Sequence, residues 1–228
     1  MNAVVGLLLA AESGSTDVVF GSTVAGRPTE IVGLDRVIGM FLNTVPVRVR
    51  LSGAETVAEL LRRMQDEYAD RMEFEYLGLG DILRAVGHSE LFDTLFVLQN
   101  FKDADEMARQ SARHDIVAED SLDHTHYPLA IVVSPGQTMH VKIDYRPDDV
   151  VDGARARALH DRFVALLGFV ARGVDLPVAS VPALTAAEHA VTEARLRAEI
   201  PEVEDAHRRP RCSRARRDRR RPHRPRLR

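Results

Sequence analysis

One short segment places neutral polar side chains where they could do chemistry. In Ile38-Gly-Met-Phe-Leu-Asn-Thr-Val-Pro-Val-Arg48, Asn43 and Thr44 stand where an apolar loop becomes a strand. A carboxamide both donates and accepts hydrogen bonds, so at the mouth of a channel Asn43 could hold an amide or thioester carbonyl without adding charge. The alternative is structural: Asn43 ends a turn, and Thr44 simply favours the strand. Gly39 would allow a close backbone approach or an unusual φ.

Other patterns that could carry chemistry are weaker. Alternation places His124 and His126 on one face of a strand, and Asp123 or His140 could add a third metal ligand. No tight motif supports that set, and surface histidines are common, so no metal ligands are predicted. The span 21–26 has the glycine spacing of a phosphate-binding loop but lacks the Lys and Ser/Thr that must follow. No nucleophile elbow occurs, so no catalytic residue is predicted either.

Periodic patterns predict the elements that position the 38–48 segment. Valines at 45, 47 and 49 alternate with polar residues, which predicts a half-buried strand over 42–51. Phe41 and Leu42, where this strand begins, are expected to be core residues. An apolar stripe that runs from Val57 to Met72 predicts a helix over 55–73. Further helices are expected at 2–12, 79–86, 152–172 and up to about 198, and further strands at 17–24, 91–101, 114–120, 127–134 and 138–145. The first helix has no capping residue, which suggests that upstream sequence is missing.

Charge divides the chain into an acidic body and a basic tail. From residue 207 onward, twelve arginines and one aspartate give +11, so the remainder carries −14 because the whole chain carries −3. An acidic body argues against a nucleic-acid partner. No apolar run reaches the roughly 18 residues of a membrane span. The single cysteine, Cys212, excludes an internal disulfide and fits a reducing cytoplasm.

Residues 201–228 are rich in arginine and proline and show no apolar periodicity. Such a segment cannot bury enough surface to offset its ordering entropy, so disorder is predicted. A basic tail could contact nucleic acid or a membrane surface. The favoured interpretation is out-of-frame translation of a GC-rich gene, because the rest of the chain offers no nucleic-acid context.

Several blocks of the sequence, in order, resemble condensation domains of nonribosomal peptide synthetases. The segment 38–48 resembles the family motif Ile/Val-Gly-x-Phe-Val/Ile-Asn-Thr followed by apolar residues and Arg. The flanking blocks are Val19 to Pro28, Glu90 to Asn100, Tyr127 to Leu129 with Ile143 to Arg146, and the linker-like Pro182 to Glu188. The resemblance covers about residues 1–190. The family's catalytic motif, His-His-x-x-x-Asp-Gly, does not occur in these 228 residues.

This resemblance implies an α/β fold with a mixed sheet flanked by helices, one lobe of the CoA-dependent acyltransferase (chloramphenicol-acetyltransferase-like) fold. It implies that the parent domain forms amide bonds between acyl groups held as thioesters on the phosphopantetheine arms of carrier proteins. It assigns Asn43, with its neighbour Thr44, to the substrate channel, and Gly39 and Arg48 to the structural motif. No cofactor is expected to bind directly, and no nucleic acid or membrane is expected as a partner.

The expected organisation is a carboxyl-terminal lobe at 1–182, a linker helix at 183–200 toward a missing adenylation domain, and the tail at 201–228. The catalytic histidine belongs to the other lobe, so the chain alone is expected to be inactive unless a separate N-terminal lobe or synthetase subunit completes it. The main alternative is a non-catalytic module that docks a carrier protein or a synthetase subunit. A basic-tailed nucleic-acid binder is the weaker alternative.

Overall fold

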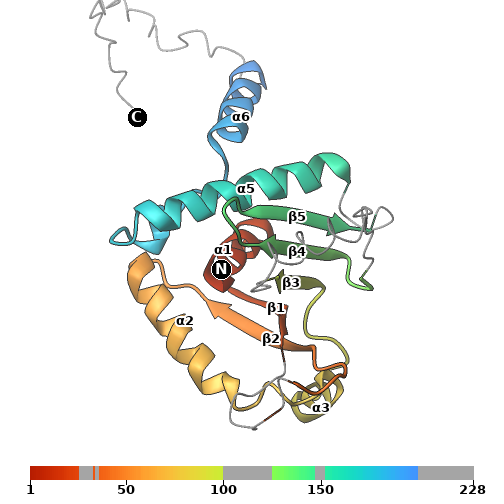
Figure 1. Ribbon diagram of the computed structural model, residues 1–228. Helices are drawn as coiled ribbons and strands as arrows, with labels where there is room; N and C mark the ends of the chain where they lie inside the picture. Colours follow the sequence, from red (N-terminus) through yellow and green to blue (C-terminus); the bar gives the residue numbers. More distant parts are fainter. Residues whose placement is uncertain (26–32, 34–35, 100–124, 147–151, 200–228) are drawn as a thin grey trace, which may run out of the picture. The chain divides into compact units, whose positions relative to one another are not determined.

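The computed structural model describes residues 1–25, 33, 36–99, 125–146 and 152–199 (Figure 1). Helices and strands are interspersed along the chain. In order they are α1 (Asn2–Ser13), β1 (Asp17–Val24), β2 (Asn43–Arg50), α2 (Val57–Met72), α3 (Leu79–Val86), β3 (Thr94–Leu98), β4 (Leu129–Ser134), β5 (His140–Tyr145), α5 (Gly153–Arg172), the 3-10 turn η2 (Val178–Ser180) and α6 (Ala186–Glu199).

The five strands of the described residues form one mixed sheet in the order β2-β1-β3-β4-β5. The outer pairs are antiparallel, with Phe20 opposite Val47 and Ile131 opposite Ile143. The inner pairs β1–β3 and β3–β4 are parallel. Parallel neighbours need crossover connections, which brings helices onto the sheet. The predicted mixed α/β sheet is therefore confirmed.

The core lies between one face of this sheet and three helices, α1, α2 and α5 (Figure 1). Val47 and Val49 are 2% and 0% exposed, which confirms the predicted alternation in β2. Phe20 meets Phe96 edge to face, with ring centroids 6.4 Å apart. By alternation, the odd-numbered residues of β1 and the even-numbered residues of β2 lie on the opposite face. The largest fully buried side chains are Phe20, Phe96, Phe163, Leu8, Leu60 and Ile131.

α1 packs unusually close to β2 because it carries a glycine at the contact. A methyl group added at Gly6 would lie 2.7–2.8 Å from three side-chain carbons of Val49. The helix ends at Gly14, which takes a left-handed φ of 69° and donates its N–H to the Ala10 carbonyl. The predicted helix at 2–12 is confirmed, and no side chain caps its beginning.

We expect Gly6→Ala to destabilise the chain by about 1–3 kcal/mol, the usual cost of overpacking a core. The added methyl must displace Val49, which is fully buried. Denaturant unfolding of the full chain measures the change. Gly80→Ala is the matched control, because nothing lies within 4 Å of a methyl at that exposed position in α3. The free energy of unfolding of the control should rise by about 0.5–1 kcal/mol, because alanine has the better helix propensity. Equal changes in the two variants would contradict the close approach of Gly6 to Val49.

α2 begins with a capping box. The Thr56 hydroxyl accepts from the Glu59 N–H at 3.2 Å, and the Glu59 carboxylate accepts from the Thr56 N–H at 2.8 Å. Val57 and Leu60 are buried, as the stripe predicts. The prediction is wrong at the last turn, where Met72 is 52% exposed. The core cluster reaches only the first half of α2, so an apolar residue at the far end finds no layer to pack against.

One strand prediction differs from the structure, and another falls on residues that the structure does not describe. The strand expected at 91–101 is shorter, Thr94–Leu98, and begins late because Phe92 lies between bends at residues 91 and 93 and packs across Gly21 instead of joining the ladder. The strand expected at 114–120 lies outside the described residues. The predicted hairpin is confirmed, since β4 and β5 pair from Leu129 opposite Tyr145 to Ser134 opposite His140.

The chain divides into two units, and the second begins at Glu188, inside α6. The helix expected to end near residue 198 is confirmed as Ala186–Glu199. The predicted tail at 201–228 lies outside the described residues. Within the part that the structure describes, no helix is long and apolar enough to cross a membrane.

Candidate functional site

Asn43 is the first residue of β2 and holds the connection between α2 and α3. Its carboxamide nitrogen donates to the backbone carbonyls of Glu75 at 2.7 Å and Leu77 at 2.8 Å. Its carboxamide oxygen accepts from the N–H of Thr44 at 2.9 Å. One side chain therefore joins two segments that are more than 30 residues apart in sequence.

These contacts limit what Asn43 can do directly. Both carboxamide protons are committed, and the oxygen has one lone pair left. A substrate carbonyl could receive a proton from Asn43 only by displacing Glu75 or Leu77. The geometry therefore places Asn43 as the residue that fixes the 73–77 connection, which begins at the end of α2 and leads into α3.

Thr44 does not share a face with Asn43. In the ladder, Asn43 lies opposite Val24 and Thr44 lies opposite Thr23, so alternation sends the two side chains to opposite sides of the sheet. Asn43 is on the side of the α2–α3 connection, whereas Thr44 is on the face away from α1 and α5. The two residues are neighbours in the sequence, but their side chains contact opposite sides of the sheet.

The loop before Asn43 is more exposed than the sequence predicts. Leu42 is 69% exposed and Phe41 is only half-buried, so the expectation that both are core residues is wrong. Phe41 instead folds its ring back over Gly39, where an added methyl would lie 3.2 Å from a ring carbon. Gly39 thus serves a close approach, and its φ is not in the left-handed region. Ile38 and Met40 are 100% and 94% exposed.

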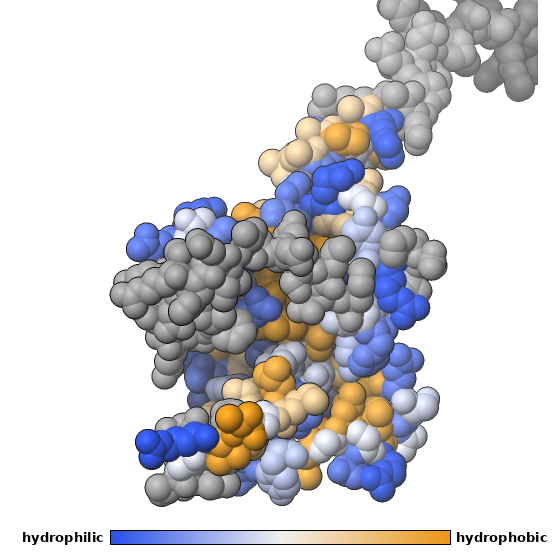
Figure 2. All heavy atoms as spheres, turned by 45° about the vertical axis from the view of Figure 1, so that its right-hand side comes forward, coloured by the Kyte–Doolittle hydropathy of each residue, from blue (hydrophilic) through white to orange (hydrophobic). Residues whose placement is uncertain are grey.

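Hydrophobic atoms also reach the surface at several places on the side of the molecule that Figure 2 shows. In the α2–α3 connection, Tyr76 is 74% exposed and Phe74 is 49% exposed. The Asn43 hydrogen bonds tie this connection to the start of β2, just after the exposed loop. Apolar side chains are therefore exposed both in the loop before Asn43 and within the connection. We define the Asn43 junction as Asn43 with residues 73–77.

Arg48 lies on the face away from the helices and binds Asp17 across the β1–β2 pair. Its Nε and Nη2 donate to the two carboxylate oxygens at 2.8 Å and 2.6 Å, a bidentate arrangement. This hydrogen bonding lowers the pKa of Asp17 and raises the pKa of Arg48. Both side chains are well exposed, at 42% and 61%, so the pair aligns the strands more than it stabilises them.

Glu75 brings a titratable group to the Asn43 junction. Its Oε1 atom is buried, and within the described residues it has no hydrogen-bond partner. Burial raises the pKa of Glu75, and the positive charge of Arg71 opposes that shift. The Arg71 guanidinium lies 5.5 Å from the Tyr68 ring centre. Ionisation of Glu75 is therefore less favourable in the folded chain than in the unfolded chain.

We expect Glu75→Gln to stabilise the chain at neutral pH. A raised folded-state pKa means that Glu75 favours folding below its ordinary pKa of 4.5 and loses that contribution as pH rises through the folded value. The advantage of the glutamine variant should therefore appear above that range and vanish in acid. Urea unfolding at several pH values measures it. Glu73→Gln, at the exposed end of α2, is the control; a pH-independent difference would contradict the burial of Glu75.

The metal alternative gains no support from the described part of the chain. His124 and Asp123 lie outside it, and no group of three potential ligand residues comes together within it. The His126 ring packs on Tyr127 with centroids 4.0 Å apart. His140 begins the edge strand β5, opposite Ser134.

Sequence reasoning missed the 75–77 connection as part of the site. The stretch holds a carboxylate, an aromatic ring and a leucine, with no motif that distinguishes it from an ordinary link between helices. What brings it to Asn43 is a pair of backbone carbonyls. Because every residue carries a carbonyl, no side-chain pattern could have predicted this contact.

The family model of the Condensation domain matches residues 1–191. This chain belongs to the condensation-domain family. It is 40% identical over 140 residues to the vanchrobactin synthetase VabF of Vibrio anguillarum, which covers 61% of the chain and 5% of that protein. It is 30% identical over 183 residues to surfactin synthase subunit 3 of Bacillus subtilis (strain 168), which covers 79% and 14%. The chain thus spans a small part of the relatives it matches.

Solved structures show the same fold. The first condensation domain of the CDA synthetase superposes with a TM-score of 0.62 at 19% identity, covering 81% of this chain and 41% of that one. The four-domain nonribosomal peptide synthetase holo-AB3403 gives a TM-score of 0.65 at 15% identity, covering 82% and 16%. These likenesses confirm the predicted α/β fold, a mixed sheet flanked by helices as found in condensation domains.

Proposed function

We propose that this chain works as the carboxyl-terminal lobe of a condensation domain in a nonribosomal peptide synthetase. The completed domain would join an aminoacyl and a peptidyl group, each held as a thioester on the phosphopantetheine arm of a carrier protein. The downstream amine attacks the upstream thioester carbonyl, an amide bond forms, and the upstream thiol leaves. The match to the family over residues 1–191 is the observation that carries this proposal.

The lobe would shape the substrate channel, and another lobe would supply the catalytic histidine. The sequence lacks His-His-x-x-x-Asp-Gly, so the chain alone is expected to form no amide bond. Asn43 would act as a positioning residue, because it fixes the 73–77 connection. Thr44 would belong to the substrate channel from the opposite face of the sheet. The proposed organisation keeps residues 1–182 as the lobe and 183–200 as a linker helix. A cytoplasmic location accords with the single cysteine.

The second candidate is a docking module without catalysis, which would bind a carrier protein or a synthetase subunit. The exposed apolar residues beside the junction, Ile38 and Met40 among them, favour a surface that another protein covers. A basic nucleic-acid tail has less support, because a lobe of this family gives it no role.

Reconstitution tests the proposal. The full chain is mixed with a separately expressed first lobe that carries His-His-x-x-x-Asp-Gly and with two loaded carrier proteins, and the dipeptidyl thioester is measured by mass spectrometry. Product is expected only when both lobes are present. Binding of a carrier protein or subunit without product, under conditions where an intact condensation domain turns over, would favour the docking module.

We expect Asn43→Ala to lower turnover in the reconstituted enzyme by up to about 100-fold while the chain stays folded, the scale for a misplacement of about 1 Å near the reacting groups. Alanine removes the two bonds to the connection without introducing a charge. Circular dichroism checks folding, and initial rates check turnover. Unchanged turnover in a working enzyme would reject the positioning role of Asn43.

A further inference from the structure

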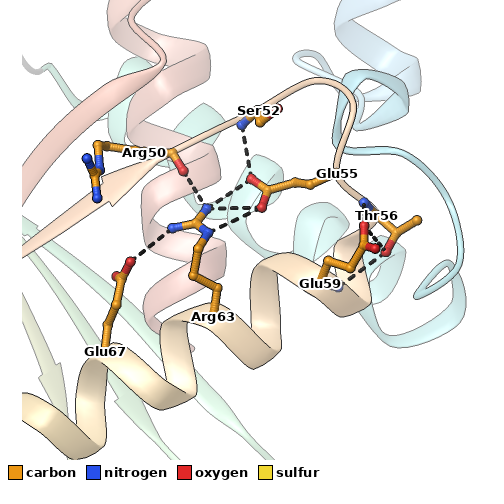
Figure 3. A network of polar contacts seen from close by, with 7 residues as sticks. All are labelled: Arg50, Ser52, Glu55, Thr56, Glu59, Arg63 and Glu67. Atoms are coloured by element: carbon orange, nitrogen blue, oxygen red, sulfur yellow. Dashed lines mark hydrogen bonds and ion pairs between the residues drawn. The ribbon is translucent and has the colours of Figure 1, made fainter.

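A polar network ties the first half of α2 to the far end of β2 (Figure 3). The Arg63 Nη2 atom donates to the Arg50 carbonyl at 2.6 Å and to the Glu55 carboxylate at 2.9 Å. Its Nε reaches the same carboxylate at 3.3 Å, and its Nη1 reaches Glu67 at 3.2 Å. Glu55 also accepts from the Ser52 N–H at 3.0 Å. One guanidinium thus links a strand end, a turn and a helix.

This network is more enclosed than an ordinary surface ion pair. The Glu55 and Arg63 side chains are 14% and 33% exposed. Hydrogen bonding to Glu55 raises the pKa of Arg63, so the guanidinium stays charged. Removing one partner of a half-buried pair leaves the other short of hydrogen bonds, which costs more than losing an exposed pair.

The same end of α2 is held by the segment that leaves α5. The N–H groups of Val57 and Ala58 donate to the carbonyls of Leu176 at 2.9 Å and Val174 at 2.7 Å. The Glu55 carbonyl accepts in turn from the Val178 N–H at 2.8 Å. These bonds satisfy donors that a helix N-terminus leaves open. Glu55 is therefore fixed by both its side chain and its backbone.

The other end of α2 leads into the Asn43 junction. The helix has 16 residues and spans about 24 Å, so a tilt of about 5° at its first turn would move its last turn by about 2 Å. A shift of that size exceeds the tolerance of the Asn43 hydrogen bonds, which are 2.7 Å and 2.8 Å long. β2 and α2 are thus joined at both ends, by Arg63 at one and by Asn43 at the other.

We propose that Glu55 and Arg63 are positioning residues for the candidate site, because they set the angle of α2 and so the place of the 73–77 connection. The proposal rests on the proposed function, which gives that connection its role in the channel. Neither residue touches the junction itself. Their effect passes through the rigid helix between the two anchors.

The side-chain amide of Asn43 provides the readout. In the full chain, its two N–H signals in a ¹H–¹⁵N spectrum report the hydrogen bonds to Glu75 and Leu77 directly. We expect Arg63→Met to shift these signals and to speed their exchange by about ten-fold, with a smaller change in Arg63→Lys. Arg62→Met is the matched control, because Arg62 is exposed on the same turn of α2 and lies outside the network.

Two spectroscopic outcomes would overturn the proposal. One is an Asn43 signal that stays as in the parent chain while the amides at the start of α2 change. The other is faster exchange at every amide, including buried Ile131, since that would report a general loss of stability. If Arg63→Met prevents folding, the same two outcomes are judged on Arg63→Lys and Glu55→Gln.

Turnover separates this proposal from the proposed function. In a working reconstituted enzyme, Arg63→Met should lower turnover while Arg62→Met does not. Unchanged turnover despite a shifted Asn43 signal would overturn the positioning role. If the parent enzyme itself makes no product, the proposed function fails, and the spectrum still decides whether Arg63 places the Asn43 junction.

Discussion

Asn43→Asp is expected to loosen the start of β2 from the α2–α3 connection and to destabilise the chain by about 2–4 kcal/mol, the cost of two lost hydrogen bonds at half-buried groups. The replacement has the same shape, but its carboxylate cannot donate. One carboxylate oxygen would take the place of the amide nitrogen and face the Glu75 and Leu77 carbonyls at distances that now hold N–H···O bonds, 2.7 Å and 2.8 Å. The free energy of unfolding in urea measures the loss.

The penalty of Asn43→Asp should depend on pH. The folded state disfavours the introduced carboxylate, so its folded pKa lies above the unfolded value and the loss shrinks in acid, where a protonated acid can again donate one bond. Thr44→Val is the control, because its hydroxyl lies on the opposite face and its loss should change stability by no more than about 0.5 kcal/mol. Equal unfolding midpoints for Asn43→Asp and the parent would show that the junction contributes no stability.

Gly21→Ala is expected to cost about 3–5 kcal/mol, the range for losing a buried phenylalanine ring from its place. A methyl at this position would overlap the edge of the Phe92 ring, with a second ring carbon only 2.7 Å away. Phe92 is only 7% exposed and stacks on Tyr127 with centroids 5.5 Å apart. A ring that moves aside for the methyl also leaves its stack on Tyr127. Phe92 then loses its packing against both Gly21 and Tyr127. Chemical unfolding of the full chain measures the cost.

A double variant identifies the cause of that loss. If the clash is with the ring, Gly21→Ala should cost much less when Phe92 is already replaced by leucine, so the two changes would be non-additive by more than about 1 kcal/mol. Gly53→Ala is the matched glycine control, because the nearest atom to its added methyl is 3.4 Å away. Strict additivity of Gly21→Ala and Phe92→Leu would contradict the close approach.

The sequence determined much of the fold because the elements that pack on the core carry periodic patterns. Val45, Val47 and Val49 alternate in β2 and are buried as predicted. α5, predicted at 152–172, buries Leu159, Phe163, Leu166 and Val170 at helical spacing. Burial of apolar surface acts on each element through its own period, so a linear sequence records it. The family resemblance, carried by the 38–48 motif and its flanking blocks, is likewise a property of the sequence and is confirmed.

Tertiary structure alone decided what the motif residues contact. The sequence could identify Asn43 as a group able to donate and accept, but not its partners, because these are backbone carbonyls more than 30 residues away. It could not predict that Leu42 and Met72 stay exposed, since that depends on where the helix layer ends. Gly6 and Gly21 matter for the same reason: the space they leave is filled by Val49 and Phe92, which the fold brings there. Local periodicity specifies elements, whereas contacts between distant segments arise only when those elements pack.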